Sequence, residues 1–211
     1  MSVEVKNLYK SFEKKNGKIE VLKDINLFFE DKKMYLIKGA SGKGKTTLLT
    51  MIGLLDSPSE GEIIVDGKHV EKLPEKELCK IRRDKYAFVF QDYGLLENLT
   101  VYENMNVQQV EMSDKLGEKE CEEILEKLNM LHRKNHKVME LSGGEKQRAA
   151  FARALVKKSD VFICDEPISN IDEENADVIR ELLMKIKEDR TVILTCHTNF
   201  FDDICDEIIR L

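Results

Sequence analysis

A glycine-rich stretch of eight residues constrains the fold of this chain more than any other feature of its sequence. Residues 39–46 read Gly-Ala-Ser-Gly-Lys-Gly-Lys-Thr and match the pattern G-x-x-x-x-G-K-[ST]. The apolar residues 34–37 precede this stretch, and the helix-forming residues 47–52 follow it. Its three glycines let the backbone turn tightly and direct N–H groups toward a polyphosphate at the start of the next helix. The pattern therefore predicts a strand, a phosphate-binding loop and a helix.

The residues of this loop have different expected roles. The Lys45 side chain is expected to reach the terminal phosphates, and the Thr46 hydroxyl is expected to bind Mg²⁺. The neighbouring residues are expected to surround the phosphates: Gly39, Ala40, Ser41, Gly42, Lys43, Gly44 and Thr47. The alternative is an ordinary glycine-rich turn between a strand and a helix, which the flanking strand and helix patterns disfavour.

The composition is that of a globular protein rather than a nucleic-acid-binding one. Hydrophobic residues make up 42% of the 211 residues, which is enough for a buried core. The 34 basic and 40 acidic residues give a formal net charge of −6. This balance argues against non-specific nucleic-acid binding, so we expect no nucleic-acid partner.

The cysteines and the apolar runs bear on the compartment. The sequence has five cysteines: Cys79, Cys121, Cys164, Cys196 and Cys205. Because the number of cysteines is odd and no C-x-x-C pair occurs, structural thiols in a reducing compartment are favoured over disulfides or a zinc site. Residues 1–6 lack a signal-peptide core, and no apolar run reaches the roughly 18 residues of a membrane-spanning helix. Any role at a membrane is therefore expected to depend on a partner.

Alternating apolar patterns predict an α/β fold. Residues 3–8 and 19–29, joined by a polar turn at 14–18, predict an antiparallel hairpin. The other expected strands are 34–38, 62–65, 86–90, 161–164, 191–195 and 208–211, and the expected helices are 46–55, 75–84, 118–131, 144–156 and 175–189. Short connections between alternating strands and helices predict a mostly parallel sheet with helices on both faces.

One segment interrupts this alternation. From residue 95 to about residue 140 the sequence is charge-rich and helix-forming, and it includes the amphipathic run 118–131. We therefore expect a single domain over residues 1–211, in which 1–94 and 141–211 form the α/β core and a helical subdomain is inserted between them.

A second motif follows a buried strand. Residues 161–164 are apolar and are followed by Asp165, Glu166 and Pro167. In an enzyme with a phosphate loop, an acid at such a strand end lies beside the nucleotide's Mg²⁺. We expect Asp165 to hold the metal through water and Glu166 to act as the general base for the attacking water. The alternative, a pair of acids that only ends a strand, is disfavoured by the glycine-rich loop upstream.

Residues 141–148, Leu-Ser-Gly-Gly-Glu-Lys-Gln-Arg, resemble the signature motif of ATP-binding-cassette (ABC) ATPases. The resemblance implies a P-loop NTPase fold that binds and hydrolyses ATP with Mg²⁺. It further implies that Ser142, Gly143 and Gly144 contact the γ-phosphate of ATP held by a second copy, so that ATP joins two copies head to tail. From the residues alone, the alternative is a Ser-capped helix without a ligand.

Further residues match the family's motifs in the family's order. The resemblance implies that Phe12, or its neighbour Tyr9, stacks on adenine. It implies that Gln91 touches Mg²⁺ and responds to a membrane subunit, and that His197 contacts the γ-phosphate and positions Glu166.

Residues 169–172 resemble the family's loop that couples the two nucleotide sites across the dimer, and the resemblance puts Asp172 at the characteristic acid of that loop. Three positions depart from the family pattern: Lys43 replaces a small serine, Asn170 replaces the commoner alanine, and Cys196 precedes the histidine. None of these departures removes a catalytic group, so we expect an active site with altered turnover.

Within the family, residues 52–56, 90–96 and 98–104 resemble the lipoprotein-release and macrolide-export type, and residues 196–201 are similar to bacteriocin-export ATPases. The resemblance implies a separate integral membrane permease, with this chain in the cytoplasm on the inner face of the cell membrane. The expected function is ATP-driven export of a peptide, lipoprotein or antimicrobial compound.

Two other functions are compatible with the same ATP cycle. One is a cassette that transmits movement to a membrane protein for signalling without transport. The other is a soluble cassette of translation or DNA repair, but such proteins usually carry two cassettes or a long inserted coiled coil, and this sequence has neither.

Overall fold

The structure, a computed structural model, describes residues 1–14, 17–110, 112 and 115–211. Residues 15 and 16 of the expected hairpin turn lie outside the described residues. Four strands form an antiparallel sheet in the order β2-β1-β4-β5. Their bounds are Val3–Lys14 for β1, Gly17–Phe29 for β2, Glu60–Val65 for β4 and Lys68–His69 for β5.

A second sheet of five strands is parallel throughout, in the order β6-β7-β8-β3-β9. Its strands are β3 (Met34–Lys38), β6 (Tyr86–Val89), β7 (Val161–Cys164), β8 (Thr191–Thr195) and β9 (Glu207–Arg210). The central strands β7 and β8 are buried along their whole length, as expected for a parallel sheet covered on both faces. The α/β class and the mostly parallel sheet predicted from the sequence are confirmed.

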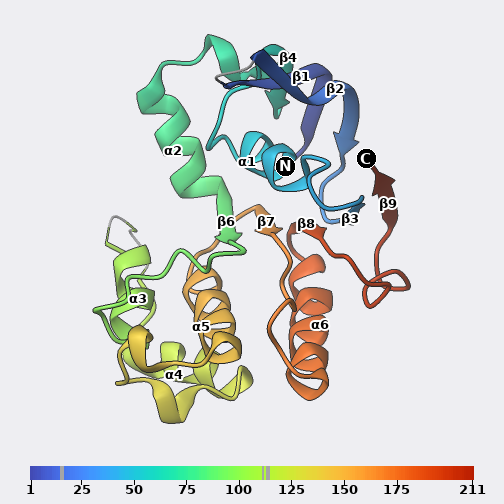
Figure 1. Ribbon diagram of the computed structural model, residues 1–211. Helices are drawn as coiled ribbons and strands as arrows, with labels where there is room; N and C mark the ends of the chain where they lie inside the picture. Colours follow the sequence, from blue (N-terminus) through green and yellow to red (C-terminus); the bar gives the residue numbers. More distant parts are fainter. Residues whose placement is uncertain (15–16, 111, 113–114) are drawn as a thin grey trace.

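The helices connect and cover the two sheets. The α-helices are α1 (Lys45–Ile52), α2 (Glu75–Lys85), α3 (Val101–Gln108), α4 (Glu118–Lys127), α5 (Gly143–Leu155) and α6 (Glu173–Lys187). Three 3-10 turns accompany them: η1 (Val70–Lys72), η2 (Leu131–Arg133) and η3 (Val138–Glu140). Figure 1 shows the antiparallel sheet and α1 at one end of the molecule, and α3, α4 and α5 grouped at the other.

The alternation of side chains along β3 separates two hydrophobic cores. Tyr35 and Ile37 pack with α1 and the antiparallel sheet, whereas Met34 and Leu36 pack with residues of α5 and α6. Successive side chains of a strand point to opposite faces, so one short apolar run anchors both layers. The glycine-rich loop leaves the carboxyl end of this doubly buried strand and is therefore held at a rigid edge of the sheet.

The segment between β6 and α5 contains α3, α4, η2 and η3, in agreement with an inserted helical region. Cys121 and Leu125 of α4 and Met105 of α3 are fully buried in the same core as α5. Figure 1 shows these helices beside α5. The exact limits of the subdomain at residues 95 and 140 remain a prediction.

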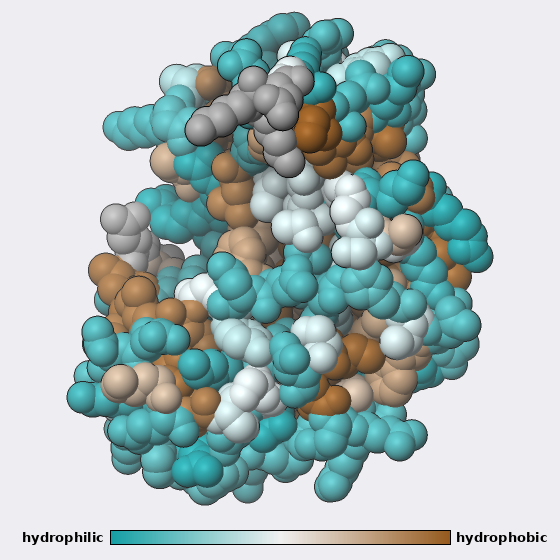
Figure 2. Space-filling view, in the orientation of Figure 1, coloured by the Kyte–Doolittle hydropathy of each residue, from teal (hydrophilic) through white to brown (hydrophobic). Residues whose placement is uncertain are grey.

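Among the residues that the structure describes, no helix is long and apolar enough to cross a membrane. Figure 2 shows a face that is mostly hydrophilic, on which hydrophobic residues form separate patches.

Candidate functional site

The glycine-rich loop between β3 and α1 has a backbone that requires glycine. Gly42 and Gly44 have φ angles of 78° and 87°, in the left-handed region that residues with a Cβ rarely adopt. A Cβ on Gly44 would also lie 2.8 Å from Cγ1 of Val21, on β2. The loop is therefore shaped by both conformation and packing, and it places the start of α1 where free N–H groups can receive an anion.

Lys45 is the first residue of α1, and it is only 6% exposed. Its Nζ donates hydrogen bonds to the carbonyl oxygens of Gly39, at 2.9 Å, and Ala40, at 3.3 Å. The ammonium group thus spans the loop. Lys43, by contrast, is exposed, and its backbone N–H donates to the carbonyl of Ala40 at 3.2 Å.

A cavity of about 280 Å³ opens beside the loop. Its lining combines the loop, β2 and three segments distant in sequence: Val21, Ser41, Gly42, Gly44, Lys45, Thr46, Thr47, Gln91, Glu166 and His197. The structure therefore brings together the phosphate loop with the predicted glutamine, general base and histidine. Gly39, Ala40 and Lys43 belong to the same loop but do not line this cavity.

Asp165, at the end of β7, joins the loop to the neighbouring strand. Its Oδ2 accepts a hydrogen bond of 2.6 Å from the Thr46 hydroxyl, and its Oδ1 accepts one of 2.6 Å from the Thr195 hydroxyl. Asp165 is 5% exposed. Two hydroxyl groups thus orient the carboxylate, one bonded to each of its oxygens, and the metal-binding role of Asp165 stays a prediction.

Glu166 lies at the next position, with a φ of 50° in the left-handed region. Its carboxylate Oε1 contacts Nε2 of His197, and its backbone N–H donates to the Thr195 hydroxyl at 2.9 Å. The Glu166 side chain is largely buried, and the His197 side chain is 45% exposed. The predicted contact between Glu166 and His197 is therefore present, and the catalytic roles of the two residues stay predictions.

The donor atoms fit Mg²⁺ better than a transition metal. The described residues contain no cluster of three or more His, Cys, Asp and Glu residues that could hold a metal ion. The oxygens of Thr46 and Asp165 meet directly. Thr46 and Gln91 line the cavity, whereas Asp165 lies behind Thr46 and is not part of the lining. A hard cation that keeps several waters and takes its other ligands from phosphate oxygens suits this sparse, all-oxygen set.

The predicted residues at the starts of α5 and α6 lie outside the cavity. Ser142 caps α5 by accepting a hydrogen bond from the Glu145 N–H at 3.3 Å, and Gly143 and Gly144 form the first turn of that helix. Asp172 caps α6 by accepting from the Asn175 N–H at 2.9 Å. None of the four lines the cavity beside the chain's own glycine-rich loop.

Phe12, the residue predicted to stack on adenine, also lies outside the cavity lining. It is 42% exposed on β1, and the Lys10 ammonium lies 5.1 Å from its ring centroid. Tyr9, the alternative, is half-buried on the same strand. The adenine-stacking role stays a prediction for both.

Two residues of the site are not marked by any motif. Val21 lines the cavity only because β2 passes beside the loop, and no sequence signal identifies it. Thr195 orients both acids, and its signal is weak: it is a hydroxyl residue at the end of an apolar run, two positions before His197.

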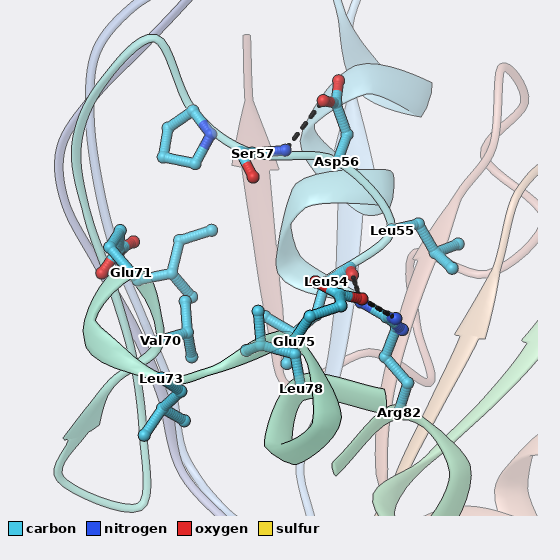
Figure 3. Close-up of a pocket in the computed structure, with 12 residues that line it drawn as sticks. Leu54, Leu55, Asp56, Ser57, Val70, Glu71, Leu73, Glu75, Leu78 and Arg82 are labelled. Carbon is cyan, nitrogen blue, oxygen red and sulfur yellow. Dashed lines mark hydrogen bonds and ion pairs between the residues drawn. The ribbon is translucent and has the colours of Figure 1, made fainter. Parts of the chain in front are cut away.

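A larger hollow of about 500 Å³ lies elsewhere, between the end of α1, η1 and α2 (Figure 3). Asp56, Glu71, Glu75 and Arg82 are its charged lining residues. Nη1 of Arg82 donates to the carbonyl oxygen of Leu54 at 2.8 Å, and Nη2 pairs with the Glu75 carboxylate. Figure 3 shows Arg82 directed toward both residues. Three carboxylates and a guanidinium that is already paired make this hollow unsuitable for a polyphosphate.

Comparisons with known proteins agree with the site. Residues 22–169 match the family model described as "ABC transporter". The chain is 37% identical over 212 residues to the macrolide export ATP-binding/permease protein MacB of Shewanella sp. (strain ANA-3). The matched region covers 99% of this chain and 32% of that protein. The chain thus spans about a third of the length of the macrolide export relatives it matches.

One further relative is named for import, and another is named only as an ATP-binding protein of an ABC transporter. The methionine import ATP-binding protein MetN 1 of Bacillus cereus (strain ATCC 10987 / NRS 248) is 38% identical, over 98% of this chain and 61% of that protein. The ABC transporter ATP-binding protein MJ0796 of Methanocaldococcus jannaschii is 37% identical, over 92% of this chain and 86% of that protein.

The MJ0796 cassette also has a solved dimeric structure, described as a post-hydrolysis state bound to ADP and Pi. It aligns with this chain at a TM-score of 0.92 and 35% identity, over 99% of this chain and 94% of that one.

Proposed function

Because this chain belongs to the ABC transporter family, we propose that it is an ATP-binding and ATP-hydrolysing subunit that drives a separate membrane protein. The observation that carries the proposal is the single cavity in which Lys45, Gln91 and Glu166 meet beside the glycine-rich loop. The relative with a solved structure is described as bound to ADP and Pi, which supports ATP as the substrate.

The chain's own groups divide the work of hydrolysis. Backbone N–H groups of the loop and the Lys45 ammonium bind the phosphates and stabilise the negative charge that develops during phosphoryl transfer. Thr46 and Asp165, with Gln91, would hold Mg²⁺, which would supply positive charge to the phosphate oxygens when bound. Glu166 orients a water molecule and accepts its proton, while His197 holds the Glu166 carboxylate.

We infer that the complete site needs a second copy of the chain. Ser142 and Gly143, at the N-terminus of α5, are exposed and lie outside the chain's own cavity. A helix start with free N–H groups can bind the γ-phosphate of another nucleotide. The dimeric state of the solved relative supports an arrangement in which two ATP molecules lie between two copies, with Asp172 near their interface.

We propose that the membrane partner is a permease and that this chain works on its cytoplasmic face. The name of the MacB relative, an ATP-binding/permease protein for macrolide export, supports export of a peptide, lipoprotein or antimicrobial compound. The import function in the name of MetN 1 supports the opposite direction. Signalling through a membrane protein without transport is the alternative, and ATP-dependent movement of a candidate substrate across vesicles separates the two.

The dependence of ATPase rate on protein concentration tests the proposal. If two copies form each site, the rate per mole of chain rises with concentration while the dimer is the minor species. A rate per mole that stays constant from nanomolar to micromolar protein, at saturating ATP, would show that a monomer is sufficient. Glu166→Gln serves as the background for contaminating ATPases.

A further inference from the structure

Tyr93 and Asn170 form a hydrogen bond between the two loops that carry Gln91 and Glu166. Nδ2 of Asn170 donates to the Tyr93 hydroxyl at 3.0 Å. The same amide lies 3.3 Å from Oγ of Ser169. Tyr93 follows Gln91 by two residues, and Asn170 follows Glu166 by four. One side-chain bond therefore spans two loops that leave different strands and enter the same cavity.

The loop on the Tyr93 side is held in an unusual backbone conformation. Tyr93 has a φ of 65°, and its N–H donates to the carbonyl of Phe90 at 3.0 Å. The Arg153 guanidinium, from α5, donates to the carbonyl of Tyr93 at 3.0 Å and also to that of Gly94. A bulky residue adopts positive φ only where its surroundings determine the conformation. The Tyr93 hydroxyl is the point at which this constrained turn meets the loop of Glu166.

The start of α5 packs directly on this pair. A Cβ on Gly143 would lie 3.4 Å from the Tyr93 hydroxyl oxygen and 3.7 Å from Cβ of Asn170. A Cβ on Gly144 would lie 3.0 Å from the carbonyl oxygen of Asn170, closer than most real contacts. Three segments therefore converge at Tyr93 and Asn170: the loop of Gln91, the loop of Glu166 and the helix start proposed to bind the second copy's ATP.

We propose that Tyr93 and Asn170 are positioning residues that set the placement of Gln91 and Glu166 relative to the start of α5. This inference rests on the proposed function. Neither side chain lines the cavity, so both act through the loops to which they belong. A catalytic group displaced by about 1 Å can lose up to about 100-fold in rate, so a bond that fixes the relation between two loops affects turnover more than nucleotide affinity. An alanine at position 170 has no amide to make this bond.

A double-mutant cycle in the full chain tests the proposal. Tyr93→Phe and Asn170→Ala each remove one partner and keep the backbone, and we expect each to lower kcat about 3- to 10-fold while KM for ATP changes less than about 2-fold. Because both variants break the same bond, the double variant should be no slower than the slower single variant. Tyr102→Phe, which removes the hydroxyl of a tyrosine on α3 whose ring lies beside Lys134, is the matched control and should retain the wild-type kcat.

Thermal unfolding separates positioning from a structural role. The bond is exposed, so both variants should unfold within about 3 °C of the wild type. Unchanged kcat in either single variant, multiplicative losses in the double variant, or losses that follow a large fall in unfolding temperature would each overturn the proposal. Failure of the proposed function is distinguishable, because the wild type itself would then show no more ATPase activity than Glu166→Gln.

Discussion

The Thr46 hydroxyl donates a hydrogen bond of 2.6 Å to Oδ2 of Asp165, across 119 positions of sequence. The bond joins the first turn of α1 to the end of β7, and Oδ1 of the same carboxylate accepts from Thr195, at the end of β8. Three elements that start or end at the same edge of the parallel sheet thus set the oxygens of one site. In an open α/β sheet this edge is where ligands bind.

The hydrogen bond between Thr46 and Asp165 leads us to expect that both residues contribute to the binding of Mg²⁺. In Thr46→Val and in Asp165→Asn, MgATP binding should weaken about tenfold or more, since each removes an oxygen ligand or its charge. Calorimetric titration with ATP in the presence of Mg²⁺ and in EDTA measures this effect. In EDTA both variants should bind ATP about as well as the wild type; an equal loss with and without Mg²⁺ would show that these residues do not serve the metal.

Removal of the Lys45 side chain is expected to weaken the binding of ATP. Its buried ammonium spans the loop, and removal of a charged group that bonds to phosphate costs about 1.5–3 kcal/mol. Lys45→Ala should therefore raise the Kd for ATP by about tenfold or more, as measured by equilibrium binding. Lys23→Ala, which removes an exposed lysine from β2, is the control for net charge. Normal ATP affinity in Lys45→Ala would contradict the phosphate-loop interpretation.

The Glu145 carboxylate is expected to make a pH-dependent contribution to the free energy of unfolding. Burial alone would raise the pKa of Glu145, but the Ser142 N–H and the Arg133 guanidinium stabilise the carboxylate, and its pKa falls to about 2. A folded-state pKa below the ordinary value of 4.5 means that the carboxylate stabilises the fold above pH 4.5 and loses this effect as pH falls toward 2.

Glu145→Gln should accordingly lower the free energy of unfolding by about 2 kcal/mol at pH 7. The difference from the wild type should shrink steadily between pH 4.5 and pH 3, as followed by denaturant unfolding at each pH. A difference that is constant over this range would show that the ion pair with Arg133 and the bond to Ser142 are not its origin.

Local patterns were sufficient to predict the parallel sheet and five of the six α-helices in the described part of the chain, because buried strands and amphipathic helices have strong periodicities. The helix α3 was expected only as part of the helix-forming region from residue 95 to about residue 140. Element ends were less accurate. The helix expected to reach Leu55 ends at Ile52, since Gly53 follows and Leu54 has a φ of 60°. The helix expected to reach Leu131 ends at Lys127, and Asn129 turns the chain with a φ of 53° while the apolar pattern continues into the core.

Strand β1 extends to Lys14, beyond the expected residues 3–8. The prediction stopped early because irregularities in the register of the strand interrupt the alternation of apolar and polar residues. The pairing with β2 shifts between Val5 and Leu8 and again between Leu8 and Lys10, which breaks the two-residue period on which the prediction rests.

The site residues Lys45, Thr46, Gln91, Glu166 and His197 were predicted from motifs, and the structure brings them together. Val21 and Thr195 were missed because only tertiary packing brings them to the site.

The central claim is that Glu166 hydrolyses ATP held between two copies of the chain, and the variant Glu166→Gln tests it most directly. The amide keeps the size of the side chain but cannot accept a proton from water. Size-exclusion chromatography with ATP, together with measurement of phosphate release, should show an ATP-dependent dimer and nearly no turnover. A variant that hydrolyses ATP at a rate close to that of the wild type, or that stays monomeric with ATP bound, would contradict the account.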